Sequence, residues 1–344
     1  MKKDQIAVIL CLGTLSLAVF TLPARAEMVW KNVTNDLGGD YGWARGSCST
    51  IVVAPGTDIV YTEIGKIGVY ASKNGGENWY DTAKDTVNVP DGIVNSFVFD
   101  PRDPNRFWFS CMYGKGLFKS TDAGKHIQQI GSFQHLDGLT IDFTDPDRKT
   151  MVFAKHEQSR SLVRSKDGGE SWHGIGMNLP DGTRFTTWPL LINSDILLTN
   201  TSGWGGGTIT GIWRSENCGD DWTKVSDSGP ICFPLLTSKG TVFYPTYGGV
   251  LRSTDTGKTW TMIRCPVSNT PIELPDGRIA ATGSQQIYIS TDNGDTWTPF
   301  GPKVPVPLSG IGPNLAYAAA RKAFFVCHGS DTTIDNAIWR LDVP

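Results

Sequence analysis

The chain has 344 residues, a formal net charge of −3 and 19% charged residues. A mildly acidic chain lacks the basic surface that general binding to nucleic acid or other polyanions requires, so we expect no nucleic-acid partner. It also contains no Gly-x-Ser-x-Gly elbow, P-loop, His-Glu-x-x-His motif or dinucleotide fingerprint, which disfavours the reaction classes that those motifs carry.

The N-terminus has the pattern of a signal peptide. Lys2 and Lys3 precede an apolar run over 6–20, and Ala24-Arg25-Ala26 supplies the small residues of a cleavage site. We therefore expect residues 1–26 to be removed and the mature chain, 27–344, to be periplasmic or secreted. No second apolar stretch approaches the roughly 20 residues of a membrane span.

Six cysteines follow the expected cleavage site: Cys48, Cys111, Cys218, Cys232, Cys265 and Cys327. An even number in an exported chain permits up to three disulfides. None of them has a C-x-x-C spacing, so a structural or unpaired role is favoured over catalysis or zinc binding. We predict no metal site and no cofactor.

One eight-residue motif, Ser-x-Asp/Asn-x-Gly-x-x-Trp, recurs along the chain. Its copies begin at Ser72, Ser120, Ser165, Ser215, Ser253 and Ser290, and only the second lacks the Trp, which is replaced by Ile127. Each copy follows a short strand-like run, such as "GIWRS" or "GVLRS", and is followed by another extended stretch. The motif is thus predicted to be a hairpin loop, with the Asp or Asn binding backbone amides and the Gly at positive φ.

The spacing of the copies predicts the architecture. About 40 residues per unit are enough for four antiparallel strands, which form one blade of a β-propeller. The segment 27–33 looks like a final strand with none before it, whereas "NAIWRLDVP" at the C-terminus looks like a third strand. If the N-terminal strand completes the last blade, the chain is a single all-β domain, a seven-bladed β-propeller over 27–344.

The motif resembles the Asp-box, or BNR repeat, of the sialidase-like superfamily, and the resemblance covers nearly the whole mature chain. Asp/Pro turns at "FDPRDPNR" and "IDFTDPDR" are similar to those of xyloglucanase-type glycoside hydrolases and sortilin-type propellers. The resemblance implies that the boxes are structural turns between third and fourth strands. It also implies that the ligand face is the opposite one.

We expect that face to be built from segments just before each first strand and between each second and third strand. The candidates for binding substrate there are Tyr41, Trp43, Arg45, Tyr113, Lys155, Arg184, Trp188, Trp204, Tyr247 and His328. Asp91, Asn95, Gln285 and Gln286 belong to the same segments. Aromatic rings beside carboxylates and amides suit sugars, whose C–H faces stack while their hydroxyls need fixed partners. Several of these residues could equally fill the tops of the blades.

Glu63 is the first catalytic candidate. The stretch "YTEIGKIGVYAS" resembles the Thr-Asp-Ile-Gly-Gly-x-Tyr stretch of xyloglucanase-type hydrolases, whose Asp is a catalytic carboxylate; here Glu63 replaces that Asp and Lys66 the second Gly. Those enzymes take the partner acid from a second propeller. In this chain it would have to be Asp91, Asp137 or Glu157, at about 5–9.5 Å.

The second candidate is a pair of segments in the third blade, "FQHLDG" and "AKHEQ". His135, His156 and Lys155, with Asp137 and Glu157, could supply a base and a cation, as a lyase acting on uronates requires. Ordinary polar loop residues would give the same pattern.

These observations predict an exported glycan-active protein. The leading hypothesis is a glycoside hydrolase with paired carboxylates. A polysaccharide lyase using His, Lys and Tyr is the enzymatic alternative, and a non-catalytic propeller that binds glycan or protein is the third, because fold does not imply function.

Overall fold

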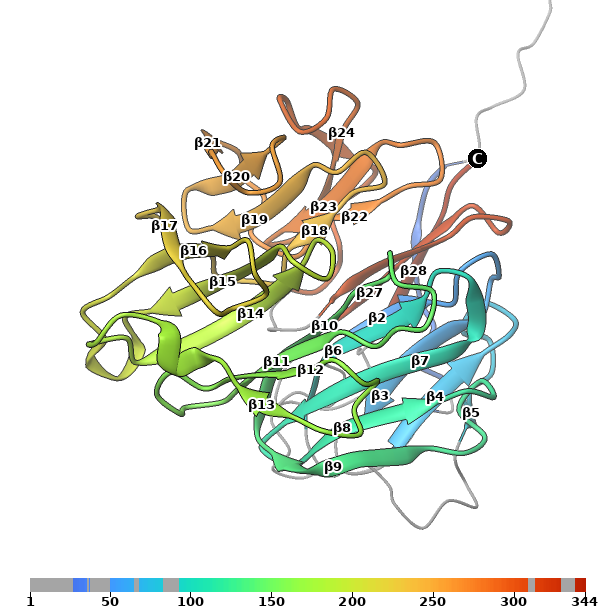
Figure 1. Ribbon diagram of the computed structural model, residues 1–344. Coiled ribbons are helices and arrows are strands. Elements are labelled where there is room, and N and C mark those ends of the chain that lie inside the picture. The colour runs from blue at the N-terminus through green and yellow to red at the C-terminus, as the bar shows by residue number, and fades with distance from the viewer. Residues whose placement is uncertain are drawn as a thin grey trace, which may run out of the picture.

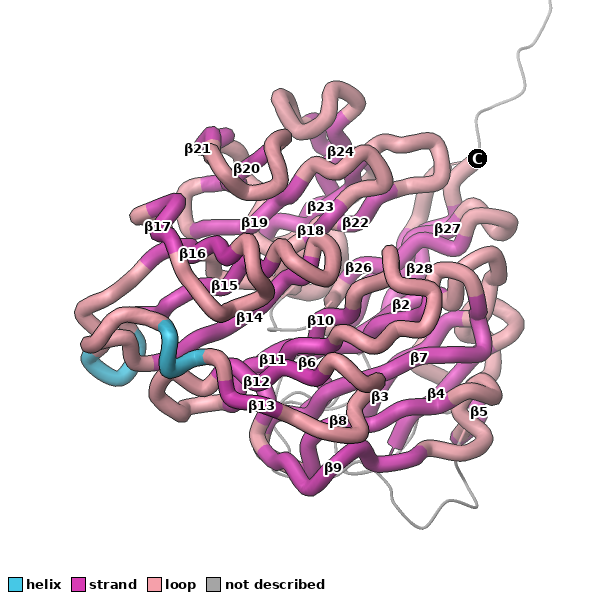
Figure 2. The backbone as a smooth tube through the Cα atoms, in the orientation of Figure 1, coloured by secondary structure: helices cyan, strands magenta, loops and turns pink. Residues whose placement is uncertain are grey.

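The computed structural model describes residues 27–35, 37, 50–64, 68–82, 93–308, 313–328 and 338–344. These residues form seven four-stranded sheets, in each of which the strands pair antiparallel. Figure 1 shows the sheets following one another around a ring, with β27 and β28 close to β2. The helical parts of the described chain are two single 3-10 turns, η1 (Gly176–Asn178) and η2 (Trp204–Gly206), as Figure 2 shows. The predicted seven-bladed all-β propeller is confirmed.

The first four blades are simple meanders. Blade 1 contains β2 (Thr50–Val53), β3 (Val60–Ile64), β4 (Gly68–Ser72) and β5 (Tyr80–Asp81). Blade 2 contains β6 (Ile93–Asp100), β7 (Asp103–Met112), β8 (Lys115–Ser120) and β9 (Gln128–Gln134). Blade 3 contains β10 (Leu136–Ile141), β11 (Met151–Lys155), β12 (Leu162–Ser165) and β13 (His173–Gly174). Blade 4 contains β14 (Phe185–Leu191), β15 (Leu197–Ser202), β16 (Gly211–Ser215) and β17 (Thr223–Ser226).

The last three blades continue the pattern. Blade 5 contains β18 (Leu235–Leu236), β19 (Val242–Thr246), β20 (Gly249–Ser253) and β21 (Thr261–Ile263). Blade 6 contains β22 (Ile272–Glu273), β23 (Ile279–Gly283), β24 (Gln286–Ser290) and β25 (Thr298–Phe300). Blade 7 contains β26 (Leu315–Ala318), β27 (Ala323–Cys327), β28 (Ile338–Asp342) and the N-terminal strand β1 (Trp30–Asn32).

The ring closes in the last blade, as the sequence predicts. Strand β1 pairs antiparallel with β28, with Trp30 opposite Leu341. The indole Nε1 of Trp30 also donates to the carbonyl of Pro302, which follows the last strand of blade 6, at 2.9 Å. Because β1 and β28 from the two ends of the chain share one sheet, the ring of blades is closed.

The hydrophobic core lies between neighbouring blades. Between blades 1 and 2, for example, Tyr61 packs with Phe97, Phe107 and Phe109, and these side chains are 6% exposed or less. Alternating side chains on each strand point to opposite faces of its sheet, so every blade contributes side chains to the clusters on both of its faces. Full burial of a ring of this size stabilises the fold by about 2–3 kcal/mol.

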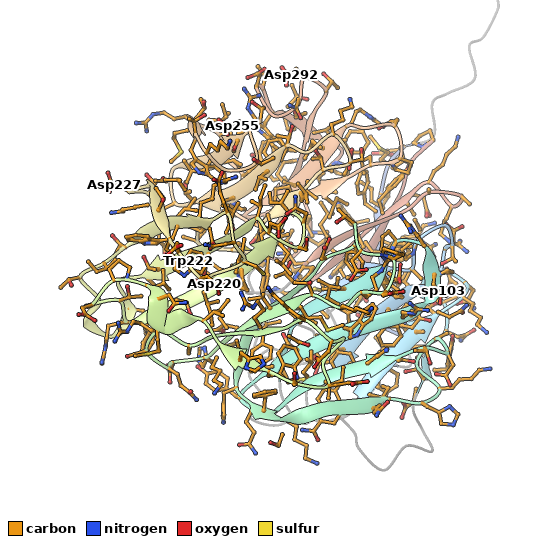
Figure 3. All side chains as sticks on the ribbon, viewed as in Figure 1. Asp103, Asp220, Trp222, Asp227, Asp255 and Asp292 are labelled. Atoms are coloured by element: carbon orange, nitrogen blue, oxygen red, sulfur yellow. The ribbon has the colours of Figure 1, made fainter. Side chains whose placement is uncertain are left out.

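The six repeated loops share one set of hydrogen bonds. The Ser hydroxyl accepts from the Gly amide at 2.7–2.9 Å, and the Asp or Asn side chain accepts from the amide four residues later at 2.8–3.0 Å. Figure 3 labels Asp255 and Asp292, two of these carboxylates, at the periphery of the molecule. Hydrogen bonds from Thr296 and Ser290 hold the pKa of Asp292 at about 2. The Ser and Asp or Asn side chains of the repeated loops therefore hydrogen-bond within their own loops.

Arginines connect several loops to the preceding blade. In four blades the residue before the last residue of the third strand, or the corresponding residue in blade 7, is an arginine. Its guanidinium donates to the backbone carbonyl of the fourth residue of the repeated loop in the next blade. The pairs are Arg164 with Cys218, Arg214 with Thr256, Arg252 with Asn293 and Arg340 with Gly75. Blades 1 and 2 have Ala71 and Lys119 at this position.

Blades 2 and 3 are joined by a buried ion pair instead. The guanidinium of Arg148 binds both carboxylate oxygens of Asp100, at 2.8 and 3.1 Å, and both side chains are almost fully buried. A bidentate pair of this kind fixes orientation as well as distance.

No disulfide joins two of the described cysteines. Cys218 is a buried residue of the fourth repeated loop, and Cys265 is half-buried. The described cysteines are spread over blades 2, 4, 5 and 7 and the segments between them. Cys48 lies outside the described residues, as does the expected signal peptide 1–26.

Candidate acid–base site

The fold gives the molecule two different ends. The turns between third and fourth strands, which carry the six loops, and the turns between first and second strands lie at one end, here called the repeat face. The starts of the inner strands and the turns between second and third strands lie at the other, here called the variable face. This follows from the antiparallel meander, in which alternate turns lie at opposite ends.

On the variable face of blade 3, His156 is held by Asp137. The imidazole Nδ1 lies 2.7 Å from Oδ2 of Asp137, and the two side chains are only 15% and 10% exposed. Asp137 is on the inner strand β10, and His156 directly follows the second strand β11. The amide of His156 also donates to the carbonyl of His135 at 2.6 Å. The two segments singled out in the sequence are therefore brought together.

The second imidazole nitrogen of His156 lies under two surface side chains. Nε2 is buried and makes no hydrogen bond, and it is 3.7 Å from a carboxylate oxygen of Glu157. The ring of Tyr113, from the β7–β8 turn of blade 2, stands edge-on to the imidazole with 4.8 Å between centroids. Tyr113 is 44% exposed and the Glu157 side chain 50%, so both border the solvent.

The surroundings of His156 change its protonation equilibrium. Burial by itself lowers the pKa of the imidazole, but the hydrogen bond with Asp137 and the negative charges of Asp137 and Glu157 outweigh it, so the pKa lies above its ordinary value of 6.5. When the ring is neutral, the carboxylate of Asp137 favours the tautomer with the proton on Nδ1. The lone pair is then on Nε2, which makes His156 a stronger base than a free histidine.

The inner strands of blades 2, 3 and 4 are irregular next to this pair. Their register shifts between Val94 and Ser96 in β6, between Leu136 and Leu139 in β10, and between Thr187 and Leu190 in β14. The inner strands of blades 1, 5, 6 and 7 show no such shift within the described residues. Bulges re-aim side chains and are common beside active sites. They fall on three candidates: Asn95, Asp137 and Trp188.

Several residues near the pair have a positive φ, as do residues of the repeated loops such as Ala123, Cys218 and Thr256. Tyr113, His135, Glu157 and Trp188 have φ values of +57°, +53°, +55° and +48°. Such values are unfavourable for large side chains and persist only where the surrounding structure enforces them, often at functional sites.

Three residues around the bulges were not predicted from the sequence: Gly138, Pro189 and Phe233. Gly138 has φ +87°, and a Cβ at this position would lie 2.8 Å from the ring of Phe233 and 3.5 Å from Pro189. Phe233 in turn packs on Trp188, with 6.3 Å between ring centroids. Only the Asp-Gly pair in "LDGL" hinted at this packing, since Gly within a strand marks a bulge or a close approach.

Glu63 lies in a different environment. It is near the end of β3 at the variable face, as predicted, but its side chain is fully buried against blade 2. One carboxylate oxygen accepts from the amide of Val94 at 3.3 Å. A substrate could reach this carboxylate only after rearrangement of the surrounding chain.

Two of the carboxylates considered as partners of Glu63 are both close to His156. Asp137 and Glu157 approach opposite nitrogens of the same imidazole, at 2.7 and 3.7 Å.

The remaining predicted residues are distributed around the variable face. Lys155 is the last residue of β11, and its ammonium lies over the ring of Phe133, 5.8 Å from the centroid. Arg184 donates to the carbonyl of Gly205 at 3.1 Å, and His328 contacts the carbonyl of Pro307.

Two further predicted residues, Trp204 and Tyr247, are 68% and 95% exposed. Tyr41, Trp43, Arg45 and Asp91 lie outside the described residues.

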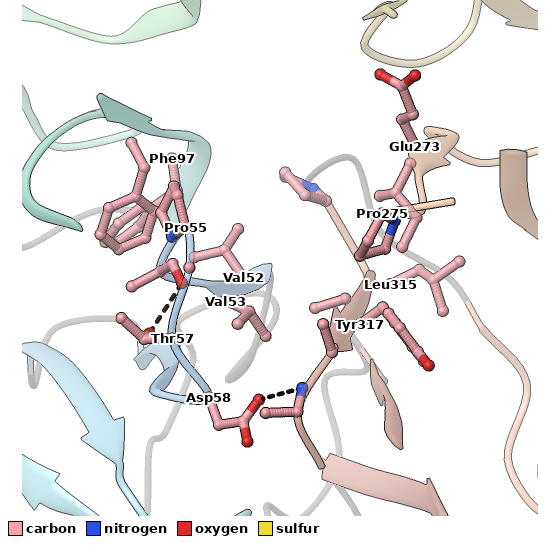
Figure 4. Close-up of a pocket in the computed structure, with 18 residues that line it drawn as sticks. Val52, Val53, Pro55, Thr57, Asp58, Phe97, Glu273, Pro275, Leu315 and Tyr317 are labelled. Atoms are coloured by element: carbon pink, nitrogen blue, oxygen red, sulfur yellow. Dashed lines mark hydrogen bonds between the residues drawn. The ribbon is translucent and has the colours of Figure 1, made fainter. Parts of the chain in front are cut away.

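Two hollows lie along the propeller axis. One, of about 280 Å³, is lined by β10 and β14 residues next to the bulges, such as Leu139 and Pro189, together with Phe233. The other, of about 590 Å³, lies at the repeat-face end, where Val52, Pro55 and Asp58 face Pro275, Leu315 and Tyr317 (Figure 4). Neither is lined by His156 or Asp137.

Within the described part of the chain, no three His, Cys, Asp or Glu side chains gather as metal ligands. The same residues include no helix long and apolar enough to cross a membrane.

Sequence comparisons place the chain among propellers of different kinds. The model of a family described as the DUF6242 beta propeller domain matches residues 27–341. A xyloglucanase of Hypocrea jecorina is 23% identical over 80% of this chain and 35% of its own length. The photosystem II assembly lipoprotein Ycf48 of a Synechococcus species is 25% identical over 47% and 46%, and rat sortilin 24% identical over 53% and 24%. The chain thus spans about a third of the length of the xyloglucanase.

A comparison with solved structures supports the fold. The GH74 xyloglucanase of Xanthomonas campestris superposes with a TM-score of 0.57 at 13% identity, covering 88% of this chain and 44% of the other.

Proposed function

The chain belongs to the DUF6242 beta propeller family, and we propose that this member is an exported enzyme that acts on a glycan at the variable face, with His156 as its general base. The substrate class is a uronate-containing polysaccharide or oligosaccharide, and the reaction is elimination.

The observation that supports this function best is the His156–Asp137 pair. It combines a partly buried imidazole, a carboxylate that fixes its tautomer and a raised pKa with an exposed aromatic ring. A titratable group whose pKa is shifted by a specific charge partner is a candidate functional residue. The bulge of β10 lies beside the same pair.

Elimination uses these groups as follows. Nε2 of His156 takes the proton from C5 of the uronate, the C4–O4 bond breaks and a C4=C5 double bond forms. The departing oxygen receives a proton from the hydroxyl of Tyr113, and the imidazolium then returns its proton through water to the Tyr113 phenolate, which restores both groups. Asp137 does not touch the substrate: it orients the imidazole and stabilises the imidazolium.

Glycosidic hydrolysis remains a second candidate because of the similarity to xyloglucanases. It would use Glu63 and a second carboxylate. The complete burial of Glu63 makes it the weaker of the two.

The test is to incubate chain 27–344 separately with polygalacturonate, alginate and xyloglucan. Elimination produces a conjugated uronate that absorbs in the ultraviolet, whereas hydrolysis produces reducing ends without that absorbance. We expect ultraviolet absorbance on a uronate polymer, its loss in His156→Gln and its retention in Glu63→Gln.

Reducing ends from xyloglucan that disappear in Glu63→Gln but persist in His156→Gln would replace elimination with hydrolysis. If none of the three polymers is cleaved by the folded protein, the enzymatic proposal fails and a binding function takes its place.

A further inference from the structure

Exposed aromatic side chains are few among the described residues and unevenly placed. The exposed Tyr and Trp side chains are Tyr80, Tyr113, Trp204 and Tyr247. The last three lie between the second and third strands of blades 2, 4 and 5, so they share the variable face. Tyr80 begins β5, the outer strand of blade 1.

The exposure of Trp204 and Tyr247 is not explained by packing. Trp204 stands in η2, within the glycine-rich connection between β15 and β16, and is 68% exposed. Tyr247 stands at the tip of the β19–β20 turn and is 95% exposed. Large rings left in water lose the stabilisation that burial would give. Trp204 and Tyr247 come from the neighbouring blades 4 and 5, on the same face, where both rings are free to stack on a ligand.

The order of these aromatic side chains around the propeller determines how long a ligand must be to contact all of them. Tyr113 contacts His156 from blade 2, whereas Trp204 and Tyr247 follow on blades 4 and 5, on the other side of blade 3. A ligand that contacts all of them must extend on both sides of the acid–base pair. A single terminal sugar can contact only the part next to His156.

We propose that Trp204 and Tyr247 form a stacking platform for an extended polysaccharide, whose inner sugar units pass over the His156–Asp137 pair. This rests on the proposed function only for the position of the reacting unit; the platform itself is a binding site. Rings stack on the C–H faces of sugars without fixing their hydroxyl pattern. The platform therefore favours length over the identity of each unit, and cleavage occurs within the chain.

Binding can be measured without turnover. Chain 27–344 and its variants are run in native gels cast with polygalacturonate, alginate or xyloglucan, and affinities for the retarding polymer and its trisaccharide are compared by calorimetry. His156→Gln is the background in which substrate is not consumed by elimination. Trp204→Ala and Tyr247→Ala test the platform, and Tyr80→Ala is a matched control on an outer strand.

We expect the polymer to bind more tightly than the trisaccharide. Trp204→Ala and Tyr247→Ala should each weaken polymer binding about tenfold, which corresponds to about 1.4 kcal/mol, and leave trisaccharide binding and the melting temperature unchanged. Tyr80→Ala should have no effect on either ligand.

The proposal is overturned if none of the three polymers retards the protein, if trisaccharide and polymer bind equally well, or if Trp204→Ala and Tyr247→Ala behave like Tyr80→Ala. Its failure is distinct from that of the proposed function. Polymer binding that depends on the two rings but without any cleavage would leave the platform standing and remove the enzyme. If cleavage is lost in His156→Gln but polymer binding is unchanged in Trp204→Ala and Tyr247→Ala, the enzyme is supported and the platform is ruled out.

Discussion

The two ends of the propeller are built on opposite principles. On the repeat face, six loops of nearly the same sequence make the same hydrogen bonds, and arginines attach four of them to the preceding blade. On the variable face of the described chain, the inner strands of blades 2 to 4 are irregular, and the His156–Asp137 pair lies beside them. On the repeat face the polar side chains hydrogen-bond to one another and stabilise the ring. On the variable face some polar atoms, such as Nε2 of His156, make no such bond and are available for a ligand.

This contrast makes a general expectation. Substitutions on the variable face should change activity and leave stability nearly intact. Substitutions on the repeat face should do the opposite.

The largest effect is expected for His156→Gln. Removal of a general base lowers kcat by about 10²- to 10⁴-fold. The glutamine keeps a polar group near Asp137, so the melting temperature should change little. The measurement is initial rate on the uronate polymer identified by the substrate panel. A rate that is unchanged would show that His156 is only a packing residue.

On the repeat face, Asp100→Ala is expected to lower the free energy of unfolding strongly. The substitution leaves the guanidinium of Arg148 buried without its carboxylate, which costs about 3–5 kcal/mol. Denaturant unfolding measures it. Asp103→Ala in the same turn, whose carboxylate is one-third exposed, is the control and should cost less than about 1 kcal/mol. Equal costs for the two variants would mean that the buried pair has no special role.

Asp137→Asn is expected to have an intermediate effect on rate. Loss of the carboxylate removes what fixes the imidazole tautomer, so kcat should fall on the order of a hundredfold. The pKa of His156 should also move down, because the group that raises it most is gone. In the wild type a general base requires neutral His156, so activity should rise with pH through a pKa above 6.5, and this acid limb should shift to lower pH in Asp137→Asn. A purely structural Asp137 would lower the rate without moving the limb.

A smaller loss of stability is expected from Ser253→Ala in the fifth loop. Its hydroxyl accepts from the amide of Gly257 and donates to Asp255. Loss of these bonds should cost about 1–2 kcal/mol by denaturant unfolding, with unchanged kcat. Thr261→Ala, on the exposed strand β21, is the control. An altered kcat in Ser253→Ala would break the division between the two ends.

The smallest effect is on the pH dependence of stability. Because the folded-state pKa of His156 is raised, its contribution is fully present below the unfolded value of about 6.5 and is lost as pH rises through the folded-state pKa. The difference in unfolding free energy between wild type and His156→Gln should therefore shrink from pH 6 to pH 9. A difference that grew with pH would contradict the assigned direction.

The sequence by itself determined the blade count, the position of the repeated loops and the closure of the ring. These depend on local chemistry: Ser, Asp and Gly bind within one loop, and alternating side chains specify strands whatever surrounds them. It also assigned His135, Asp137 and His156 to one blade end, since segments at equivalent positions of a meander meet there.

Tertiary structure decided which candidates stand in contact and which are covered. The contact of Tyr113 with His156, the burial of Glu63 against Val94 and the bulges at Asn95, Asp137 and Trp188 all depend on how neighbouring blades pack. Residues such as Gly138 and Phe233 are far apart in the chain and show no pattern that links them. The repeated loops could be predicted because the hydrogen bonds of each Ser and Asp lie within one loop, whereas contacts such as that of Tyr113 with His156 form between blades, where only the folded ring sets the distances.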